Sequence, residues 1–471
     1  MHIEQIYTGC LAQGAYYIES NGEAVVIDPL RETDPYIERA TARGAKIKYI
    51  LETHFHADFV SGHVDLAKKT GATIVYGPTA QTGYDAKIAE DNEVLNVGDV
   101  TITVLHTPGH TMESSTFLLK DETGKDYAIF SGDTLFLGDV GRPDLAIKQG
   151  EITREDLAGF LFDSLRNKIM PLSDDLLVYP GHGAGSACGK NMSSETWGYL
   201  GDQKKNNYAL RADMTKEEFI KEVTDGLVAP PQYFPKNAMM NKTGYDSIDE
   251  VMERGARPLS PREFEAAANE TEALLLDVRN REDFVKGFVP NSIYIGLDGQ
   301  FAPWVGSLIV DLKQPILIIA PEGKEEETVS RLARVGYDNS IGYLKGGFEA
   351  WKADGQEIDT IESIDAAAFA DVYGQDNNIN ILDVRKEGEW TSENIGSAQH
   401  FALDHINKNM SEVDPGKHYY LHCRSGYRST VASSILRARG FEKLTNVLTS
   451  FEAISESSIP TSAWVCPSTL K

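Results

Sequence analysis

Cysteine is scarce in this chain, and so are basic residues and long apolar runs. Four cysteines in 471 residues are too few for a disulfide framework, which favours a reducing cytoplasm. Lys and Arg number 45 against 71 Asp and Glu, a formal charge of −26, which argues against nucleic acid or an anionic membrane as a partner. The longest apolar stretches, such as residues 316–320, have only strand length, and the first twenty residues lack a signal-peptide pattern. We therefore expect a cytoplasmic, water-soluble protein.

The length of the chain predicts about three domains. Residues 1–245 alternate strand-like runs with glycine-bounded or amphipathic segments, which is typical of a domain made of layered sheets and helices. The Pro-rich stretch at 229–241 is interpreted as an irregular closing segment or linker. The first domain is therefore predicted to occupy residues 1–245.

An internal repeat follows the first domain. LLLDVRNREDF at 274–284 recurs as NILDVRKEGEW at 380–390, about a hundred residues later, and the helix-like segments downstream recur as well. A repeat of this length indicates two copies of one globular α/β domain, because the units of a solenoid are shorter. We place the two copies at residues 255–357 and 360–471.

Metal-ligating residue types follow several predicted strands of the first domain. They lie in the segments THFHAD, TPGH, SGD and YPGH, and are His54, His56, Asp58, His110, Asp133 and His182. Alternation along an extended segment puts His54 and His56 on the same side. Imidazoles and carboxylates that converge on strand ends are the arrangement that a metal site needs. The first domain is therefore expected to hold a metal.

These motifs resemble the metallo-β-lactamase superfamily, whose pattern is HxHxDH…H…D…H, and the resemblance covers the whole first domain. It implies an αββα sandwich. The pattern departs at Phe59, where the family has a histidine. Phenylalanine cannot ligate a metal, so a two-zinc hydrolase centre is disfavoured. Within the superfamily, this departure resembles the persulfide dioxygenases, which hold one iron.

The resemblance assigns roles to the individual residues of the first domain. It implies one Fe(II) per chain, held by His54, His110 and Asp133, a donor set that leaves positions for a persulfide and dioxygen. The remaining three candidates, His56, Asp58 and His182, are expected beside the ligands, as orienting groups or as vestigial ligands. Arg142 is a candidate for binding a substrate carboxylate or for an ion pair within the domain. Cys188 is a weaker candidate for a place near the metal.

The second chemical signal is the segment HCRSGYRSTVASSILRARGF at 422–441. Cys423 ends an apolar strand, and a short turn leads into a helix that begins near Ser429. The free N–H groups of a helix N-terminus favour an anion, and Arg424 and Arg428 add positive charge. Both effects favour the thiolate, which makes Cys423 the candidate nucleophile.

This last domain resembles the rhodanese family. The loop CRSGYR has six residues, whereas related phosphatases use one more, so its length favours sulfur transfer through a Cys423 persulfide with Arg424 and Arg428 beside it. Asp383 and Arg385 are interpreted as a structural pair. The first copy has no cysteine; Ile319 or Ala320 aligns with Cys423, and the following loop is acidic. An acidic loop disfavours a thiolate, so this copy is predicted to be catalytically silent.

The fold expected from these observations is a multidomain α/β chain: a metallo-β-lactamase αββα sandwich followed by two rhodanese-like α/β domains. The expected function is oxidation of a low-molecular-weight thiol persulfide, such as glutathione persulfide, by dioxygen to sulfite, coupled to sulfur transfer that forms or consumes thiosulfate. One alternative is a zinc-dependent thioester hydrolase of the glyoxalase II type with a rhodanese domain. Another is a non-catalytic sulfur carrier or persulfide sensor. A homodimer is suggested only by analogy with the superfamily.

Overall fold

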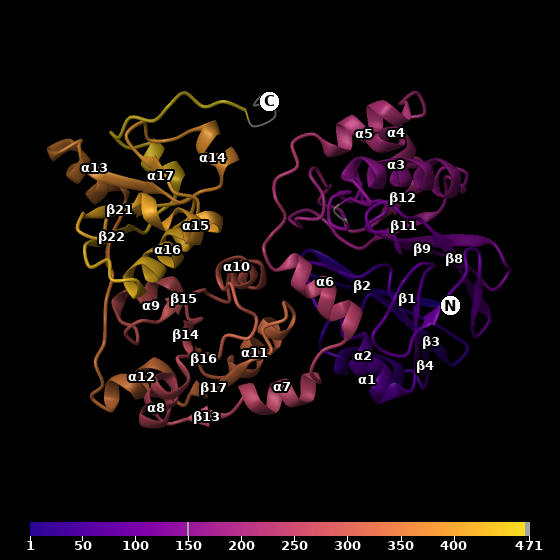
Figure 1. The fold of residues 1–471 in the computed structure, drawn as a ribbon, viewed down its shortest axis with the longest axis horizontal. Coiled ribbons are helices and arrows are strands. Elements are labelled where there is room, and N and C mark those ends of the chain that lie inside the picture. The colour runs from indigo at the N-terminus through magenta and orange to yellow at the C-terminus, as the bar shows by residue number, and fades with distance from the viewer. Residues whose placement is uncertain (148–149, 467–471) are drawn as a thin grey trace. The chain divides into compact units, whose positions relative to one another are not determined.

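The computed structural model describes residues 1–147 and 150–466. The chain divides into two compact units (Figure 1). The first comprises Met1–Ile248 together with Ala333–Gly336, and the second Asp249–Leu332 together with Tyr337–Lys471. Within the described residues, no helix has both the length and the apolar character needed to cross a membrane.

Two six-stranded sheets form the centre of the first unit. One has the order β1(His2–Thr8), β2(Gln13–Ser20), β3(Glu23–Ile27), β4(Lys46–Leu51), β5(Thr73–Tyr76), β6(Lys87–Ile88). The other has the order β12(Gly198–Tyr199), β11(Leu177–Pro180), β10(Asp126–Gly132), β9(Ser115–Lys120), β8(Val100–His106), β7(Val94–Val97). The helices of this unit are α1(Asp34–Ala42), α2(His63–Thr70), α3(Arg154–Ser164), α4(Leu200–Asn206), α5(Lys216–Thr224) and α6(Phe234–Thr243).

The two sheets pack face to face, and helices cover both outer faces. Side-chain alternation along β2 explains the layering, because Tyr16 and Ile18 join the core between the sheets, whereas Ala15 and Tyr17 join the core under α1 and α2. On the other sheet, Ile129 packs outward beneath α3, α4 and α5 (Figure 1). The predicted αββα sandwich is therefore confirmed.

The second unit contains the two copies of the repeat, each built on a five-stranded parallel sheet. The first sheet has the order β13(Pro258–Leu259), β17(Ser340–Leu344), β16(Ile316–Ile319), β14(Leu274–Asp277), β15(Ile293–Tyr294). The second has the order β18(Glu362–Ile364), β22(Leu444–Val447), β21(Tyr419–His422), β19(Asn380–Asp383), β20(Gln399–His400). The strands follow one another through each sheet in the same sequence, so the duplication read from the sequence extends to the topology.

Helices connect the strands of both copies. Those of the first are α8(Pro261–Thr271), α9(Arg281–Lys286), α10(Phe301–Leu308), α11(Glu325–Ala333) and α12(Gly347–Ala353), preceded by α7(Ile248–Gly255). Those of the second are α13(Ala366–Gln375), α14(Glu387–Ser392), α15(Ile406–Asn409), α16(Tyr427–Ala438) and α17(Phe451–Ser455). Parallel strands covered by helices are buried on both faces, which is why residues 316–319 form a continuous apolar run.

One part of the chain differs from the interpretation of its sequence. The Pro-rich stretch at 229–241 was expected to be irregular, but its second half forms α6. Pro235 lies in the first turn of this helix, where its missing N–H costs no hydrogen bond. A proline therefore begins this element instead of interrupting it.

Candidate functional site

Three of the predicted metal ligands come together where strands of the first unit end. His54 follows β4, His110 follows β8, and Asp133 follows β10. Their ligand atoms all lie within 4.8 Å of one another. The Nε2 atoms of His54 and His110 lie 3.8 Å and 3.4 Å from Oδ2 of Asp133. The three side chains are buried and point at a common centre, as a metal site requires.

Hydrogen bonds to neighbouring groups orient both imidazoles. Nδ1 of His110 donates to the backbone carbonyl of Arg142 over 2.8 Å. The Thr53 hydroxyl donates to Asp28, so it accepts from Nδ1 of His54, at 2.9 Å. In each ring the proton is therefore held at Nδ1, which leaves the lone pair of Nε2 directed at the centre.

The electrostatics of these three residues suit a cation. Burial lowers the pKa of both His54 and His110, so the imidazoles are neutral and can ligate. Burial alone would raise the pKa of Asp133, but the histidines around it, His182 first, lower that pKa instead. Oδ2 of Asp133 is buried and has no hydrogen-bond partner among the described residues. A buried, ionised oxygen without a donor fits a bound metal ion.

The other three histidine and aspartate candidates lie nearby in two separate groups. His182 lies between two carboxylates, with Nδ1 2.8 Å from Asp133 and Nε2 2.8 Å from Asp58. Burial alone would lower the pKa of His182, but the charges of Asp133 and Asp58 raise it well above its ordinary value. The two carboxylates therefore favour the protonated form of this ring.

Cys188 lies close to Asp58 and His182 and forms a second group of potential metal ligands with them. In the sequence analysis this cysteine was only a weaker candidate for a place near the metal. Ligand atoms of the three residues lie within 4.8 Å of one another, and all three are buried. Burial, followed by the charges of Asp58 and Asp133, raises the pKa of the Cys188 thiol well above its ordinary value. Without a metal, this thiol is therefore protonated and a poor nucleophile.

His56 belongs to a different group from the predicted ligands, with Asp28 and Glu52, although its ring lies 4.2 Å from that of His54 between centroids. Its Nε2 atom lies 3.1 Å from Asp28 and 3.6 Å from Glu52. The ring of Phe59 packs against it, with 4.3 Å between ring centroids. Phe59 therefore fills space beside His56 in addition to removing a ligand from the family pattern.

Arg142 lies in an ion pair within its own domain. Its Nε and Nη2 atoms donate to both carboxylate oxygens of Asp144, and Nη1 donates to the carbonyl of Ala187. The side chain is only 4% exposed. Of the two roles considered for Arg142, the geometry favours the ion pair, while its backbone carbonyl orients His110.

Asn241 of α6 is a site-supporting residue that the sequence reasoning missed. Its side-chain amide donates to the carbonyls of His56 and Phe59, and its oxygen accepts from the N–H of Ser61. These three hydrogen bonds fix the loop that carries the HxHxD motif. The only signal for this role in the sequence was the asparagine of the MMN segment itself. Nothing in the sequence connects it to the loop, because nearly two hundred residues separate them.

Cys423 lies at the start of the loop between β21 and α16. The side chain is fully buried, and Sγ accepts a hydrogen bond from the N–H of Gly426 over 3.1 Å. Gly426 has a φ of +85°, a left-handed conformation that turns its N–H toward the sulfur. The hydroxyl of Ser429, in the first turn of α16, lies 3.7 Å from Sγ. The thiol donates to this hydroxyl, which itself donates to the carbonyl of Gly426. The loop thus places the sulfur at a helix N-terminus, where the N–H of Gly426 donates to it.

The two arginines beside Cys423 differ in their surroundings. Arg428 makes a double ion pair with Glu389 of α14, at 2.6 Å and 2.8 Å. The side chain of Arg424 is exposed, and its carbonyl accepts from the N–H of Phe451. Arg428 is therefore a fixed positive charge near the sulfur, whereas Arg424 faces solvent, where an incoming anion would meet it.

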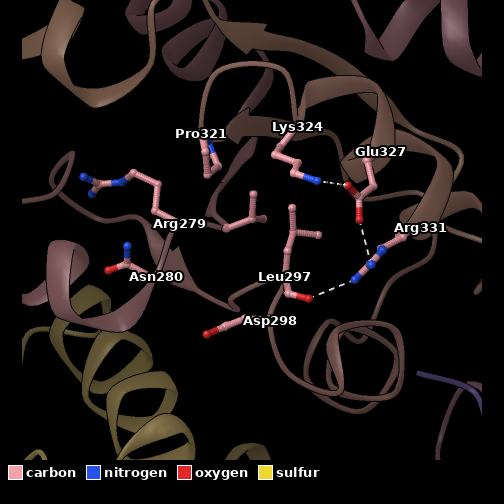
Figure 2. A pocket seen from close by; sticks show the side chains of 9 residues that line it. Arg279, Asn280, Leu297, Asp298, Pro321, Lys324, Glu327 and Arg331 are labelled. Carbon is pink, nitrogen blue, oxygen red and sulfur yellow. Dashed lines mark hydrogen bonds and ion pairs between the residues drawn. The ribbon is translucent and has the colours of Figure 1, made fainter. Parts of the chain in front are cut away.

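The first rhodanese-like copy has a corresponding loop without a cysteine. Strand register places Ala320 where Cys423 lies, because Asp277 pairs with Ile319 as Asp383 pairs with His422. A pocket of about 350 Å³ lies at this loop (Figure 2). Two cations on its wall, Lys324 and Arg331, both pair with Glu327.

Comparison with known proteins places both units in families. A model of the metallo-β-lactamase superfamily matches residues 8–182, and a model of the rhodanese-like domain matches residues 260–354 and 366–457. A metallo-β-lactamase structure from Staphylococcus aureus is 31% identical with a TM-score of 0.65, and the match covers 73% of this chain and 99% of that one. The chain therefore belongs to the metallo-β-lactamase superfamily and carries two rhodanese-like domains.

Curated relatives of the first unit are named as hydrolases. A probable hydroxyacylglutathione hydrolase of Schizosaccharomyces pombe is 28% identical over 204 residues, which are 42% of this chain and 75% of the relative. The cytoplasmic hydroxyacylglutathione hydrolase of Arabidopsis thaliana is 32% identical over 178 residues, which are 37% of this chain and 65% of the relative. Both matches cover less than half of this chain.

Proposed function

We propose that this chain is a mononuclear iron persulfide dioxygenase joined to a rhodanese sulfurtransferase. The observation that carries the proposal is the convergence of His54, His110 and Asp133, whose ligand atoms lie within 4.8 Å of one another, with Phe59 where the family pattern has a further histidine. Two imidazoles and one carboxylate are a donor set suited to non-haem Fe(II), with open positions for substrates. When bound, the ion would supply the activation of dioxygen that side chains cannot provide.

The residues around the centre have defined tasks in this proposal. Thr53 and the carbonyl of Arg142 keep the Nδ1 protons of His54 and His110 in place, so both Nε2 atoms stay available. His182 holds its protons between Asp58 and Asp133, where its charge offsets theirs. In the overall reaction a thiol persulfide, dioxygen and water give the free thiol, sulfite and protons. The glutathione-related names of the relatives support glutathione persulfide as the first substrate to test.

Cys423 would carry out the second reaction. Cys423 takes the outer sulfur of a thiol persulfide, releasing the free thiol, and passes that sulfur to sulfite, forming thiosulfate and restoring the thiolate. Thiosulfate can load the same cysteine by the reverse of the second step, releasing sulfite. Fusing both activities in one chain raises the effective concentration of sulfite near the transferase. With Cys423→Ser, we expect persulfide oxidation to continue, sulfite to accumulate and thiosulfate to fall. Unchanged thiosulfate without sulfite accumulation would contradict the coupling.

The decisive experiment compares metal content and oxygen uptake in matched variants. Anaerobically purified wild-type protein should contain about one iron per chain and consume oxygen with glutathione persulfide. Asp133→Ala should lose both iron and oxygen uptake. Asp58→Asn changes the other carboxylate beside His182 and should retain iron, because Asp58 lies outside the donor set. Two zinc ions per chain with full activity, or oxygen uptake unaffected by Asp133→Ala, would refute the proposal.

A zinc-dependent thioester hydrolase is the second candidate. It is favoured by the names of the relatives and by Cys188, which joins Asp58 and His182 in a possible second donor group despite Phe59. This candidate predicts hydrolysis of S-lactoylglutathione, two zinc ions per chain, and loss of one of them in Cys188→Ser. Oxygen uptake with glutathione persulfide and no thioester hydrolysis would exclude it. A non-catalytic sulfur carrier predicts a labelled Cys423 persulfide with neither activity at the metal.

A further inference from the structure

The residue that follows the Cys423 loop glycine is anchored in the silent copy. Tyr427 begins α16, and its hydroxyl donates to the backbone carbonyl of Gly296 over 2.8 Å. The side chain is only 8% exposed. Gly296 lies just after β15 of the first copy, so this hydrogen bond joins the two copies within the second unit. The helix that follows the nucleophile loop, α16, is therefore held at its first residue by the other copy.

The silent copy leaves room for this tyrosine at Gly299. A Cβ atom at Gly299 would lie 2.5 Å and 2.6 Å from Cε2 and Cζ of the Tyr427 ring, which are closer than any normal contact. The ring of Tyr294 packs on the other side, with 5.8 Å between ring centroids in an edge-to-face arrangement. The backbone N–H of Tyr294 donates to the Ser434 hydroxyl of α16, so a second hydrogen bond joins the copies. The tyrosine thus occupies a fitted recess.

The segment that forms this recess is itself held by the helix that corresponds to α16 in the silent copy. Arg331 of α11 donates to the carbonyl of Leu297 over 2.9 Å and pairs with Glu327 (Figure 2). The N–H of Leu297 donates to Val278 at the end of β14. Both the N–H and the carbonyl of Leu297, which lies between Gly296 and Gly299, are therefore held by hydrogen bonds within the first copy.

We propose that the silent rhodanese-like copy acts as a positioning domain for the sulfur-transfer loop, with Tyr427, Gly296 and Gly299 forming the connection. Tyr427 directly follows Gly426, whose N–H donates to Cys423 Sγ. Fixing Tyr427 fixes the first turn of α16, and with it the neighbouring N–H of Gly426 that donates to the sulfur. The inference rests on the proposed transferase function of Cys423. Tyr427 is a positioning residue, since no contact joins its side chain to the sulfur among the described residues.

Two variants of the full chain test the contact between Tyr427 and the first copy, one changed in each copy. Tyr427→Phe keeps the ring and removes the hydrogen bond to Gly296, and we expect a loss of about threefold to fivefold in the saturating rate of sulfur transfer from thiosulfate to cyanide. Gly299→Ala pushes the ring out of its recess, and we expect a loss of about tenfold or more. Because both changes act on one contact, the double variant should be no slower than Gly299→Ala alone.

A matched control removes the charge of Lys324, which lines the same pocket as Leu297. Lys324→Met removes a charge that pairs with Glu327 but makes no bond to residues 296–299, and should transfer sulfur at the wild-type rate. Unfolding midpoints of all variants show whether a loss reflects general instability, and KM for thiosulfate should stay constant while kcat falls. Wild-type rates in both Tyr427→Phe and Gly299→Ala, or multiplied losses in the double variant, would overturn the proposal. If the wild-type chain forms no Cys423 persulfide, the transferase function itself is wrong.

Discussion

The two rhodanese-like copies share their framework and differ in their chemistry. Asp277 and Arg279 of the first copy make the same buried ion pair as Asp383 and Arg385 of the second. Each arginine also reaches a backbone carbonyl eight residues along the chain, and each lies over a phenylalanine ring. The DVR motif therefore makes the same contacts in both copies, whether or not a cysteine is present in the loop.

The loops that follow β16 and β21 also share a backbone feature and differ in their side chains. Gly323 and Gly426 have φ angles of +80° and +85°, so the backbone turns in the same way whether or not a nucleophile is present. The differences with a direct chemical consequence include Ala320 in place of Cys423 and Glu325 in place of Arg428. Loop shape is thus a property of the backbone and its glycine, whereas reactivity depends on one sulfur and the charge beside it.

The largest expected effect is on the rate of sulfur transfer, and it comes from removing the cysteine that only the second copy has. Cys423→Ser should lower sulfur transfer by about a thousandfold or more, because no other group in the loop can form the persulfide. Ala320→Cys restores a thiol at the corresponding point of the silent copy, but with Glu325 nearby it should be alkylated at least about tenfold more slowly than Cys423. Peptide-resolved alkylation with iodoacetamide measures both thiols in one sample. Equal rates would show that the acidic loop is not what silences the first copy.

The Asp–Arg ion pair of the DVR motif allows a second comparison between the copies. Asp383→Asn leaves the Arg385 charge without its partner, and the side chain of that arginine is only 4% exposed, so we expect a loss of about 3 to 5 kcal/mol in stability. Asp277→Asn should cost less, because the side chain of Arg279 is 12% exposed and water can compensate in part. Urea unfolding of the two variants gives the difference. A larger loss for Asp277→Asn would contradict this ranking by burial.

A third difference concerns acid sensitivity, since the active copy has His422 where the silent copy has Ile319. Burial, assisted by Arg385, lowers the pKa of His422 from 6.5 to about 4 despite the opposing charge of Asp383. The unfolded chain then binds the extra proton, so stability is fully present above pH 6.5 and is lost as the pH falls toward 4. The maximum loss is about 3 kcal/mol.

The measurement for His422 is the urea concentration at which each copy becomes sensitive to protease, at pH 7 and at pH 5. The active copy should lose more stability than the silent copy over this interval. His422→Ile gives the active copy the silent residue and should remove the difference between the two copies. If the variant keeps the full acid sensitivity, another group must carry it.

Sequence reasoning predicted the features that depend on local pattern. Strand-end motifs indicated six candidate ligands, from which the resemblance to persulfide dioxygenases selected His54, His110 and Asp133. The repeat of the DVR segment predicted two domains, because such repetition is visible in the sequence itself. The sequence could not predict that His56 turns toward Asp28 and Glu52. That orientation depends on packing between segments brought together only by the fold.

The same limit applies to the positions of three other residues. Cys188 is next to Asp58, Asn241 holds the HxHxD loop, and Tyr427 enters the other rhodanese-like copy, yet each lies far along the chain from its partner. No periodic pattern marks such contacts, because a single hydrogen bond or recess needs only one suitable residue. The loops showed where chemistry is expected, whereas the contacts of Asn241 and Tyr427 emerged only from the structure; Cys188 had been a weaker candidate in the sequence.

The smallest expected effect compares the two loop glycines. Alanine at either Gly323 or Gly426 must adopt a left-handed conformation, which costs about 1 to 2 kcal/mol in each copy. A Cβ at Gly426 would also meet the flexible end of Leu448 at 2.9 Å, whereas one at Gly323 meets nothing within 4 Å, so the two losses should be similar, with Gly426→Ala slightly larger. Only Gly426→Ala should slow persulfide formation, because only this N–H donates to a sulfur. Equal slowing by Gly323→Ala would mean that the silent loop influences the active loop beyond the contact through Tyr427.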